Sequence, residues 1–301
     1  MAGILLTGST GQVGAELAAL DWPEGLTPIA PARAELDLAD RASIEHWLMS
    51  RDLAGILSVG AYTAVDKAES EVAEAWSVNA LAPAVLAAHA ARRGIPIVQV
   101  STDYVFDGSK AGPYDVDDPV RPLGVYGASK EGGEQAVRTA RARHAILRTS
   151  WVVGAHGANF VRTMLRLGRE RPVLRVVDDQ WGAPALAADV AAVLQTMMIR
   201  LVRDPAAPTG TFHFTSSGET TWCGLARAVF EASRRHGGPA PDVQAIATAD
   251  YPTPARRPAN SRLSLERLRN DYGITPRPWQ AGIDSLVERL LAEPGQQGTS
   301  P

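Results

Sequence analysis

Apolar runs alternate with amphipathic stretches through the first half of the chain. The runs predict strands at residues 4–7, 26–30, 55–59, 95–101 and 145–150. The intervening stretches carry apolar side chains three or four positions apart and predict helices at residues 12–20, 42–50, 69–93 (where Pro83 can introduce a kink) and 129–143. Because this alternation is typical of repeated βα units, we predict an α/β fold whose doubly wound parallel sheet is covered by helices on both faces.

The pattern is less regular after Gly154. It predicts helices at residues 159–168, 187–200 and 222–235 and short strands at residues 173–177 and 211–214. Proline-rich segments at residues 251–258 and 275–279 predict loops. We therefore assign residues 1–155 to one domain and residues 156–301 mainly to a smaller α/β domain, interleaved with the first because residues 183–203 return to pack on its sheet.

Composition and charge exclude several classes of protein. The 301 residues include 45% hydrophobic and 21% charged residues, which is ordinary globular usage. A formal net charge of −3 argues against a nucleic-acid partner, which needs a basic surface to replace counterions. The single cysteine, Cys223, excludes an internal disulfide, and no His/Cys spacing is that of a zinc site. No secretory signal follows Met1 and no segment approaches the roughly 20 apolar residues of a membrane span, so we expect a cytoplasmic protein with no membrane partner. We expect the polar tail, residues 293–301, to fray.

A glycine-rich turn follows the first predicted strand and opens the first predicted helix. Its sequence is Thr-Gly-Ser-Thr-Gly-Gln-Val-Gly at residues 7–14. Glycine lets a backbone approach a pyrophosphate, and the free N–H groups at a helix amino terminus point at its oxygens. We expect Gly8 and Gly11 to line the phosphates of a dinucleotide, and Gly14 to permit close packing of helix on strand. A plain tight turn is the alternative, but the position in a βαβ series favours a Rossmann-type NAD(P)-binding domain.

The end of the second predicted strand is where such a domain selects its cofactor. An acidic side chain there binds the ribose of NAD, whereas a basic one accommodates the 2′-phosphate of NADP. Arg33 is basic and favours NADPH, although it can also be a solvated surface residue. Glu35 and Asp37 can reach the ribose or the adenine instead. The sequence therefore leaves both NADPH and NADH open.

Tyr126 and Lys130 stand four residues apart near the start of a predicted helix, so both project from one face. A free tyrosine has a pKa near 10 and is a poor acid at neutral pH. We expect the fixed ammonium of Lys130, aided by a positive nicotinamide ring, to lower the pKa of Tyr126 by about 1 to 3 pH units. Lys130 is one of only three lysines, and a compact ammonium suits hydrogen bonds to ribose hydroxyls. The pair therefore predicts proton transfer by Tyr126 and cofactor binding by Lys130.

Thr102 directly follows the strand predicted at residues 95–101, within Ser-Thr-Asp-Tyr-Val-Phe-Asp-Gly at residues 101–108. The carboxyl edge of an open parallel sheet is where ligands bind. At that edge Thr102 can hydrogen-bond a substrate carbonyl or Tyr126. The alternative is a hydroxyl that only caps the local backbone.

Seven segments along nearly the whole chain together resemble those of the dTDP-4-dehydrorhamnose reductases, a family of extended short-chain dehydrogenases/reductases. Beside the two quoted above, they are Ala-Tyr-Thr-Ala-Val-Asp-Lys-Ala-Glu at 61–69, Tyr-Gly-Ala-Ser-Lys at 126–130, Arg-Thr-Ser-Trp-Val at 148–152, Asp-Gln-Trp-Gly-Ala-Pro at 179–184 and Tyr-Pro-Thr-Pro-Ala-Arg-Arg-Pro at 251–258. Sugar epimerases share the glycine turn and the Tyr/Lys pair. The segments of the second half are more particular to the reductases.

The resemblance implies reduction of the 4-keto group of dTDP-4-dehydro-β-L-rhamnose to dTDP-β-L-rhamnose, with hydride from NADPH or NADH. It implies that Tyr126 protonates the developing alkoxide, that Lys130 positions Tyr126 and the ribose, and that Thr102 assists. The second domain would bind the substrate. The sugar contacts would be Thr102, Asp103, Tyr126 and Trp151, although Trp151 can also be a core aromatic residue. The cofactor contacts would be Gly8, Gly11, Gln12, Val13, Gly14, Arg33, Asp37, Leu38, Ala61, Tyr62, Thr63, Tyr126 and Lys130.

Some positions depart from the family pattern. Val59 and Gly60 stand where relatives often carry an asparagine, and Gly132 and Gly133 are expected to weaken the catalytic helix by up to about 1 kcal/mol each. Some relatives join two subunits through glutamates around Mg²⁺. No complete set of such glutamates matches here, so we assign no metal ligand, and the sequence leaves Mg²⁺ and the choice between monomer and homodimer open. Three arginines are candidates for the substrate diphosphate, with no preference among them: Arg256, Arg257 and Arg262.

Two other functions use parts of this pattern. A nucleotide-sugar 4-epimerase or dehydratase uses the same Tyr/Lys pair but retains its NAD, so net NADPH consumption distinguishes it from a reductase. A non-catalytic regulatory subunit keeps the dinucleotide fold as a binding module. Such a module has no need of the proton-transfer set Thr102, Tyr126 and Lys130, which favours an enzyme.

Overall fold

A computed structural model describes residues 2–292, and its centre is a six-stranded sheet in which all neighbouring strands are parallel. The strands, in their order across the sheet, are β10 (Gly210–Phe214), β5 (His144–Thr149), β4 (Ile97–Thr102), β3 (Leu53–Ser58), β1 (Ala2–Leu6) and β2 (Leu26–Ile29). The five strands predicted in the first half are all present, and the predicted doubly wound α/β class is confirmed.

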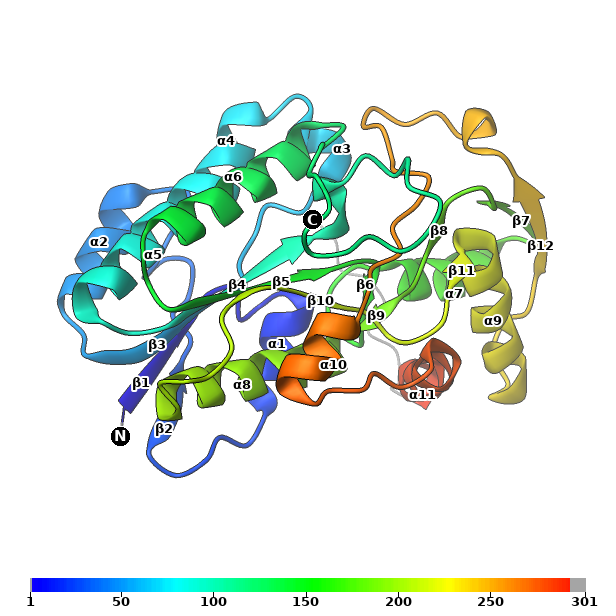
Figure 1. Ribbon diagram of the computed structural model, residues 1–301. Coiled ribbons are helices and arrows are strands. Elements are labelled where there is room, and N and C mark those ends of the chain that lie inside the picture. Colours follow the sequence, from blue (N-terminus) through cyan, green and yellow to red (C-terminus); the bar gives the residue numbers. More distant parts are fainter. Residues whose placement is uncertain (1, 293–301) are drawn as a thin grey trace.

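Helices cover both faces of this sheet (Figure 1). One face carries α2 (Arg41–Met49), α5 (Ala82–Arg93) and α6 (Val125–Thr139), and the other carries α1 (Gln12–Ala19), α8 (Ala187–Arg203) and α10 (Glu266–Tyr272). Successive residues of β1 point to opposite faces, so Leu5 packs under α2 and α5 whereas Ile4 and Leu6 pack under α8. Because both faces are buried, the strands are nearly continuous apolar runs, which is why the sequence pattern located them.

The chain winds outward from β1 in both directions. β2 lies on one side of β1, while β3, β4 and β5 follow on the other, so the connections reverse direction between β1 and β3. Open α/β sheets bind ligands at such a reversal, beyond the carboxyl ends of the strands. The glycine turn follows β1, Val59 follows β3 and Thr102 ends β4, so all three segments reach this edge.

The helix predicted at residues 69–93 is where expectation and structure differ most. It is divided into α4 (Val72–Trp76), a π-helical turn η1 (Ser77–Leu81) and α5, and it is preceded by the short α3 (Val65–Ala68). Pro83 has no N–H to donate to the carbonyl of Asn79 four residues earlier, and the wider π turn accommodates this loss.

A smaller α/β unit lies beside the main sheet, at the right of Figure 1. It contains α7 (Phe160–Glu170), α9 (Trp222–Arg235), α11 (Trp279–Ala292) and the parallel pair β7 (Val173–Val177) and β12 (Asp242–Ile246). Two short ladders form separate two-stranded sheets: β6 (Val152–Val153) with β9 (Ala185–Leu186), and β8 (Trp181–Gly182) with β11 (Thr220–Thr221). The remaining turns are η2 (Asp103–Val105) and η3 (Thr248–Asp250).

The two halves of the sequence interleave through α8 and β10. The apolar side of α8, including Leu194 and Met197, is buried against the main sheet. The strand expected at residues 211–214 in the smaller domain is instead β10, the sixth strand of the main sheet, where Phe212 and Phe214 are buried. The tail that we expected to fray, residues 293–301, lies outside the described residues.

Candidate active site

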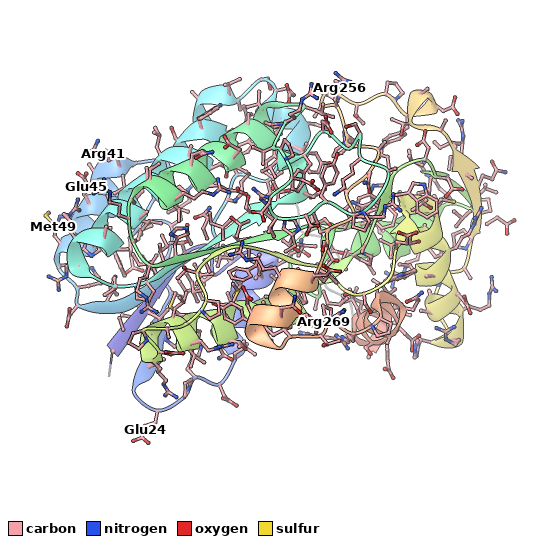
Figure 2. All side chains as sticks on the ribbon, in the orientation of Figure 1. Glu24, Arg41, Glu45, Met49, Arg256 and Arg269 are labelled. Atoms are coloured by element: carbon pink, nitrogen blue, oxygen red, sulfur yellow. The ribbon has the colours of Figure 1, made fainter. Side chains whose placement is uncertain are left out.

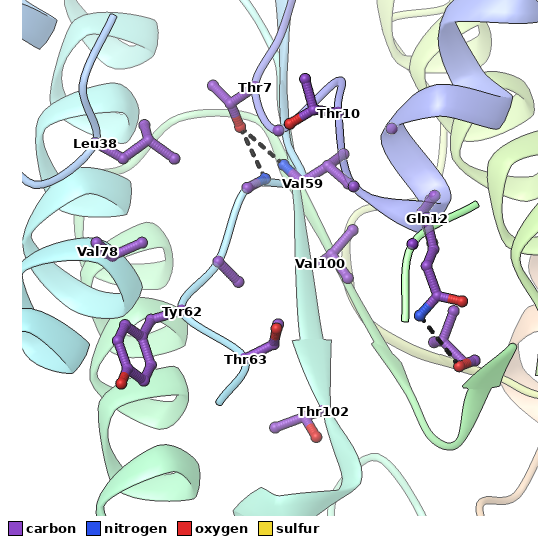
Figure 3. A pocket seen from close by; sticks show the side chains of 18 of the residues that line it. Thr7, Thr10, Gln12, Leu38, Val59, Tyr62, Thr63, Val78, Val100 and Thr102 are labelled. Carbon is purple, nitrogen blue, oxygen red and sulfur yellow. Dashed lines mark hydrogen bonds between the residues drawn. The ribbon is translucent and has the colours of Figure 1, made fainter. Parts of the chain in front are cut away.

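A cleft of about 830 Å³ opens beyond the carboxyl ends of the central strands (Figure 3). The turn after β1, the loop after β3, the end of β4 and the start of α6 contribute its walls. Glu35, one of the two acids considered for the ribose, does not line it. Every residue that the family resemblance assigned to cofactor or sugar does: Gly8, Gly11, Gln12, Val13, Gly14, Arg33, Asp37, Leu38, Ala61, Tyr62, Thr63, Thr102, Asp103, Tyr126, Lys130 and Trp151.

The glycine turn is compact enough to require glycine at two positions. Gly8 has φ +71°, and a Cβ on it would lie 2.5 Å from the Cα of Gly60. A Cβ on Gly14 would overlap the carbonyl oxygen of Gly8. Gly14 therefore permits the helix to pack on the turn itself, and not on the strand as we expected. Thr7, which the sequence analysis passed over, fixes the turn to the next strand, because its Oγ1 accepts hydrogen bonds from the N–H groups of Val59 (3.0 Å) and Gly60 (3.1 Å) (Figure 3).

The region expected to bind the ribose carries opposite charges. Arg33 and Asp37 form an ion pair of 3.6 Å, with 76% of the Arg33 side chain exposed. Leu38 packs against Gly60, where a Cβ would lie 2.5 Å from Leu38 Cδ1. The glycine that departs from the family pattern at position 60 therefore lies close to Gly8 and Leu38, and a side chain there would displace the end of Leu38.

The π turn places Asn79 between the loop after β3 and the helix α6. Its buried amide accepts a hydrogen bond from Tyr62 N at 2.9 Å and donates to Tyr62 O and to Ser129 Oγ, both at 3.0 Å. Gly133 faces the same turn, because a Cβ there would overlap the Asn79 carbonyl oxygen. The neighbouring Gly132 likewise makes room for Trp76. The glycines expected only to weaken α6 thus allow it to approach η1 closely.

The helix α6 begins at Val125, four residues earlier than predicted, so Tyr126 lies in its first turn. Its N-cap is Gly124, which has no side chain to cap the helix. Glu69, the residue directly after α3, supplies the cap, with its Oε1 accepting a hydrogen bond of 2.9 Å from Val125 N. A carboxylate is favoured at this positive end of the helix dipole. Glu69 therefore fixes the turn that carries Tyr126, a role that no local pattern indicated.

Lys130 is buried, and its Nζ donates a hydrogen bond of 2.6 Å to the carbonyl oxygen of Val100. Burial lowers the pKa of Lys130 to about 8, although the nearby Glu134 carboxylate opposes this. Burial raises the pKa of Tyr126 to about 12, which a hydrogen bond from Thr102 partly offsets. The expected lowering of the Tyr126 pKa by Lys130 is therefore not found in the protein chain alone, because desolvation is the largest influence on both groups. The phenol is protonated at neutral pH, as a proton donor must be.

Thr102 stands between two partners for its single hydroxyl proton. It is hydrogen-bonded to Asp103 Oδ1 at 3.1 Å as well as to Tyr126. Burial raises the pKa of Asp103 to about 6. Tyr104, also missed by the sequence analysis, lines the cleft and meets the Tyr126 ring edge-to-face with 5.4 Å between ring centroids. The proposed proton donor is thus enclosed by Thr102, Asp103 and Tyr104.

A buried ion pair joins α6 to β5. Arg148 donates from Nε and Nη2 to the two Glu134 carboxylate oxygens, at 2.8 and 2.7 Å. Both side chains are almost fully buried. Burial alone would raise the pKa of Glu134, but the hydrogen bonds and charge of Arg148 outweigh it and lower the pKa overall.

Trp151 forms part of the cleft wall directly after β5. Its φ of +47° is rare for a bulky residue, and such conformations cost about 1–3 kcal/mol unless the surroundings impose them. Its indole stacks on Trp222, with 3.7 Å between ring centroids and an interplanar angle of 16°. Trp151 therefore faces the cleft while it also packs against the core of the smaller unit.

The three arginines proposed for the substrate diphosphate do not line the cleft. Arg257 makes a two-pronged ion pair with Asp66, at 2.8 and 3.0 Å, and its hydrogen bond lowers the Asp66 pKa. Arg262 pairs with Glu219 at 2.9 Å. Arg256 is exposed on the outer surface (Figure 2).

Within residues 2–292, no group of three or more His, Cys, Asp or Glu side chains could hold a metal ion. None of the helices in this part of the chain combines the length and apolar character needed to cross a membrane.

Comparisons with known proteins agree on one family. A family model described as the RmlD substrate binding domain matches residues 1–292. A dTDP-4-dehydrorhamnose reductase from Sinorhizobium fredii is 42% identical over 291 residues, covering 96% of this chain and 98% of the relative. The crystal structure of a dTDP-4-dehydrorhamnose reductase from Clostridium acetobutylicum has a TM-score of 0.88 at 33% identity, covering 96% of this chain and 99% of that one. Another, from Bacillus anthracis in complex with NADP, has a TM-score of 0.87 at 30% identity, covering 98% and 100%. This chain therefore belongs to the RmlD family of dTDP-4-dehydrorhamnose reductases.

Proposed function

We propose that this chain reduces the 4-keto group of dTDP-4-dehydro-β-L-rhamnose to give dTDP-β-L-rhamnose, with NADPH or NADH as the reductant. The observation that carries this proposal is the meeting of the glycine turn, Thr102, Tyr126 and Lys130 in one cleft, in a member of the reductase family. A dinucleotide site beside an enclosed phenol is the arrangement that reduction of a carbonyl requires.

The glycine turn fits the pyrophosphate of a dinucleotide. Gly11 is the N-cap of α1 and provides no side chain to its first turn, which also contains no acidic residue. The free N–H groups and the positive end of α1 are therefore open to an anion. The exposed Arg33 favours a 2′-phosphate near the second strand, and the relative from Bacillus anthracis is in complex with NADP. We accordingly propose a preference for NADPH over NADH.

The cofactor, when bound, supplies a hydride to the carbonyl carbon. Tyr126 donates its hydroxyl proton to the carbonyl oxygen, on which negative charge develops. Thr102 then directs its hydroxyl proton toward the resulting phenolate, which its hydrogen bond stabilises. Lys130 provides a positive charge one helical turn after Tyr126, held in place by the carbonyl of Val100. Asp103 and Trp151 are the proposed sugar contacts.

The test is an assay of the purified protein with freshly generated dTDP-4-dehydro-β-L-rhamnose and either NADPH or NADH. We expect stoichiometric loss of reduced-nicotinamide absorbance and formation of dTDP-β-L-rhamnose, identified by NMR. The corresponding UDP-sugar is the control for nucleotide recognition. Conversion of the sugar without net NADPH consumption would instead indicate the epimerase or dehydratase alternative. Cofactor binding with no conversion of any keto sugar would indicate the regulatory module.

A further inference from the structure

One wall of the cleft is held in place by residues that do not themselves line it. Trp151 reaches the cleft in a left-handed backbone conformation, with φ +47°. A tryptophan keeps such a conformation only where its surroundings impose it. Trp222 and Gly182 contact the indole from the smaller unit, and Phe160 packs behind Trp222.

The stack on Trp222 is close and continues into the core of the smaller unit. The rings of Trp151 and Trp222 are 3.7 Å apart between centroids and nearly parallel, at 16°. Phe160, the first residue of α7, packs on Trp222, with 4.8 Å between the two ring centroids. Trp222 is the first residue of α9, whose N-cap Thr221 accepts a hydrogen bond from Gly224 N at 3.0 Å. The ring of Trp222 is therefore held between the first turns of α7 and α9.

Gly182 makes room for the same indole. A Cβ at this position would lie 2.6 Å from Cε2 and 2.7 Å from Cζ2 of Trp151, inside contact distance. Gly182 pairs with Thr220 in the short ladder of β8 and β11, two residues before Trp222. Gly182 therefore lies in this ladder and Trp222 directly follows its second strand, so the ladder places both supports of the indole.

We propose that Trp222 and Gly182 are positioning residues that hold the Trp151 indole as a wall of the sugar site and thereby set affinity for the sugar nucleotide. This inference rests on the proposed function and extends it to residues outside the cleft. An aromatic ring with a fixed orientation offers a rigid apolar surface to a deoxysugar, at little cost in side-chain entropy. The glycine turn and Arg33, which serve the proposed cofactor site, belong to other elements, so the two substrates should respond differently.

The first experiment compares the Michaelis constants of Trp222→Ala, Trp222→Phe and the wild type. We expect Trp222→Ala to raise KM for the dTDP-keto-sugar about 3- to 10-fold, the range that corresponds to loss of one aromatic pair, with KM for NADPH within about twofold. Trp222→Phe keeps an aromatic surface under Trp151 and should stay close to the wild type. Trp22→Ala is the control, because Trp22 packs against the hydrophobic core between the main sheet and α8 and does not line the cleft.

Gly182→Ala tests the second residue proposed to position the Trp151 indole. We expect it to raise KM for the sugar nucleotide in the same direction, because the added methyl group must displace the indole. Gly112→Ala is its matched control, since a Cβ on Gly112 meets nothing within 4 Å. Dissociation constants for dTDP-rhamnose, measured by calorimetry, provide the same comparison without turnover.

Nuclear Overhauser effects between the ring protons of Trp151 and Trp222 report the stack directly. We expect them in the wild type, because the ring centroids are 3.7 Å apart. Their absence in the wild type overturns the inference, and so does an unchanged sugar KM in Trp222→Ala. A wild type that neither binds dTDP-rhamnose nor consumes NADPH refutes the proposed function instead, so the two failures are distinguishable.

Discussion

The ammonium of Lys130 donates a hydrogen bond of 2.6 Å to the carbonyl oxygen of Val100, which joins the helix carrying Tyr126 to the strand that ends at Thr102. The proposed proton donor and the sheet edge therefore form one rigid unit. Desolvation of this unit keeps the Tyr126 phenol protonated and makes the Lys130 ammonium easier to deprotonate, since its pKa falls to about 8. The proposed proton transfer in this enclosed site involves Thr102, Tyr126 and Lys130.

Tyr126→Phe should abolish most of the turnover and leave the cofactor site intact. Removing a general acid typically costs about 10²- to 10⁴-fold in rate, and the substitution deletes only the hydroxyl group. We expect kcat to fall by at least about 10²-fold while the dissociation constant for NADPH stays within about twofold. Steady-state kinetics and fluorescence titration with NADPH measure the two quantities. Full activity in this variant would refute the assignment of Tyr126 as the proton donor.

Glu69→Ala should loosen the start of the catalytic helix. The substitution removes the acceptor for Val125 N, and loss of a helix cap costs about 1 kcal/mol. We expect a lower thermal midpoint together with a lower kcat, because Tyr126 lies next to the released N–H group. Glu69→Gln retains an acceptor oxygen and should recover most of the loss. If Glu69→Gln were as impaired as Glu69→Ala, charge and not capping would be the important property of Glu69.

The edge of the sheet could be predicted from the sequence because it follows from local patterns. The glycine turn and Thr102 each come directly after an apolar run, and the carboxyl ends of parallel strands share an edge. The pairing of Arg148 with an acidic side chain could also have been predicted from the sequence. A charged residue inside an apolar strand must be paired when it is buried, which indicates a partner such as Glu134.

The supports of the site could not be predicted in this way. Asn79, Gly182 and Trp222 act through contacts between segments far apart in the chain, and each is an ordinary residue within its own segment. The direction of the Tyr126 pKa change could not be predicted either. It depends on how completely the fold removes water from the phenol, and an adjacent lysine in the sequence does not reveal this.

Gly14→Ala and Gly11→Ala should affect different properties. A Cβ at position 14 would overlap the carbonyl oxygen of Gly8, so we expect Gly14→Ala to lower the stability of the whole turn. A Cβ at position 11 would lie 3.3 Å from that oxygen, which is tight but within reach of a small adjustment. We therefore expect Gly11→Ala to fold normally and to weaken NADPH binding, because the methyl group stands where the pyrophosphate should approach. Thermal denaturation and NADPH titration of both variants check this, and equal NADPH affinity in Gly11→Ala and the wild type would contradict it.

Glu134→Gln should destabilise the protein most at neutral pH. The substitution leaves the buried Arg148 without its counter-charge, which typically costs about 3 kcal/mol or more. The pKa of Glu134 is lowered in the folded protein, so its stabilising contribution is present above its usual pKa of 4.5 and is lost as the pH falls below that value. Urea denaturation should show that Glu134→Gln loses more unfolding free energy, relative to the wild type, at pH 7 than at pH 4.

The matched control for this variant is Glu45→Gln. Glu45 pairs with Arg41 on the outer side of α2, and both project into solvent (Figure 2). An exposed pair of this kind contributes less than about 1 kcal/mol. If Glu134→Gln lost no more unfolding free energy than Glu45→Gln, the buried pair would not be needed for stability.

Asp103→Asn should stabilise the fold while it impairs catalysis. Burial raises the pKa of Asp103 from 3.8 to about 6, so the folded protein binds a proton that the unfolded chain has already released in this window. Stability therefore falls as the pH rises from about 4 to 6, and the full penalty, at most about 3 kcal/mol, is present above pH 6. Asparagine carries no charge to desolvate, so the variant should have a higher urea midpoint than the wild type at pH 7.5. The difference should narrow toward pH 4. The same substitution takes the carboxylate from Thr102 and from the proposed sugar site, so we expect kcat/KM for the sugar nucleotide to fall. A variant that is less stable than the wild type at pH 7.5 would show that the hydrogen bonds of Asp103 outweigh the cost of burying its charge.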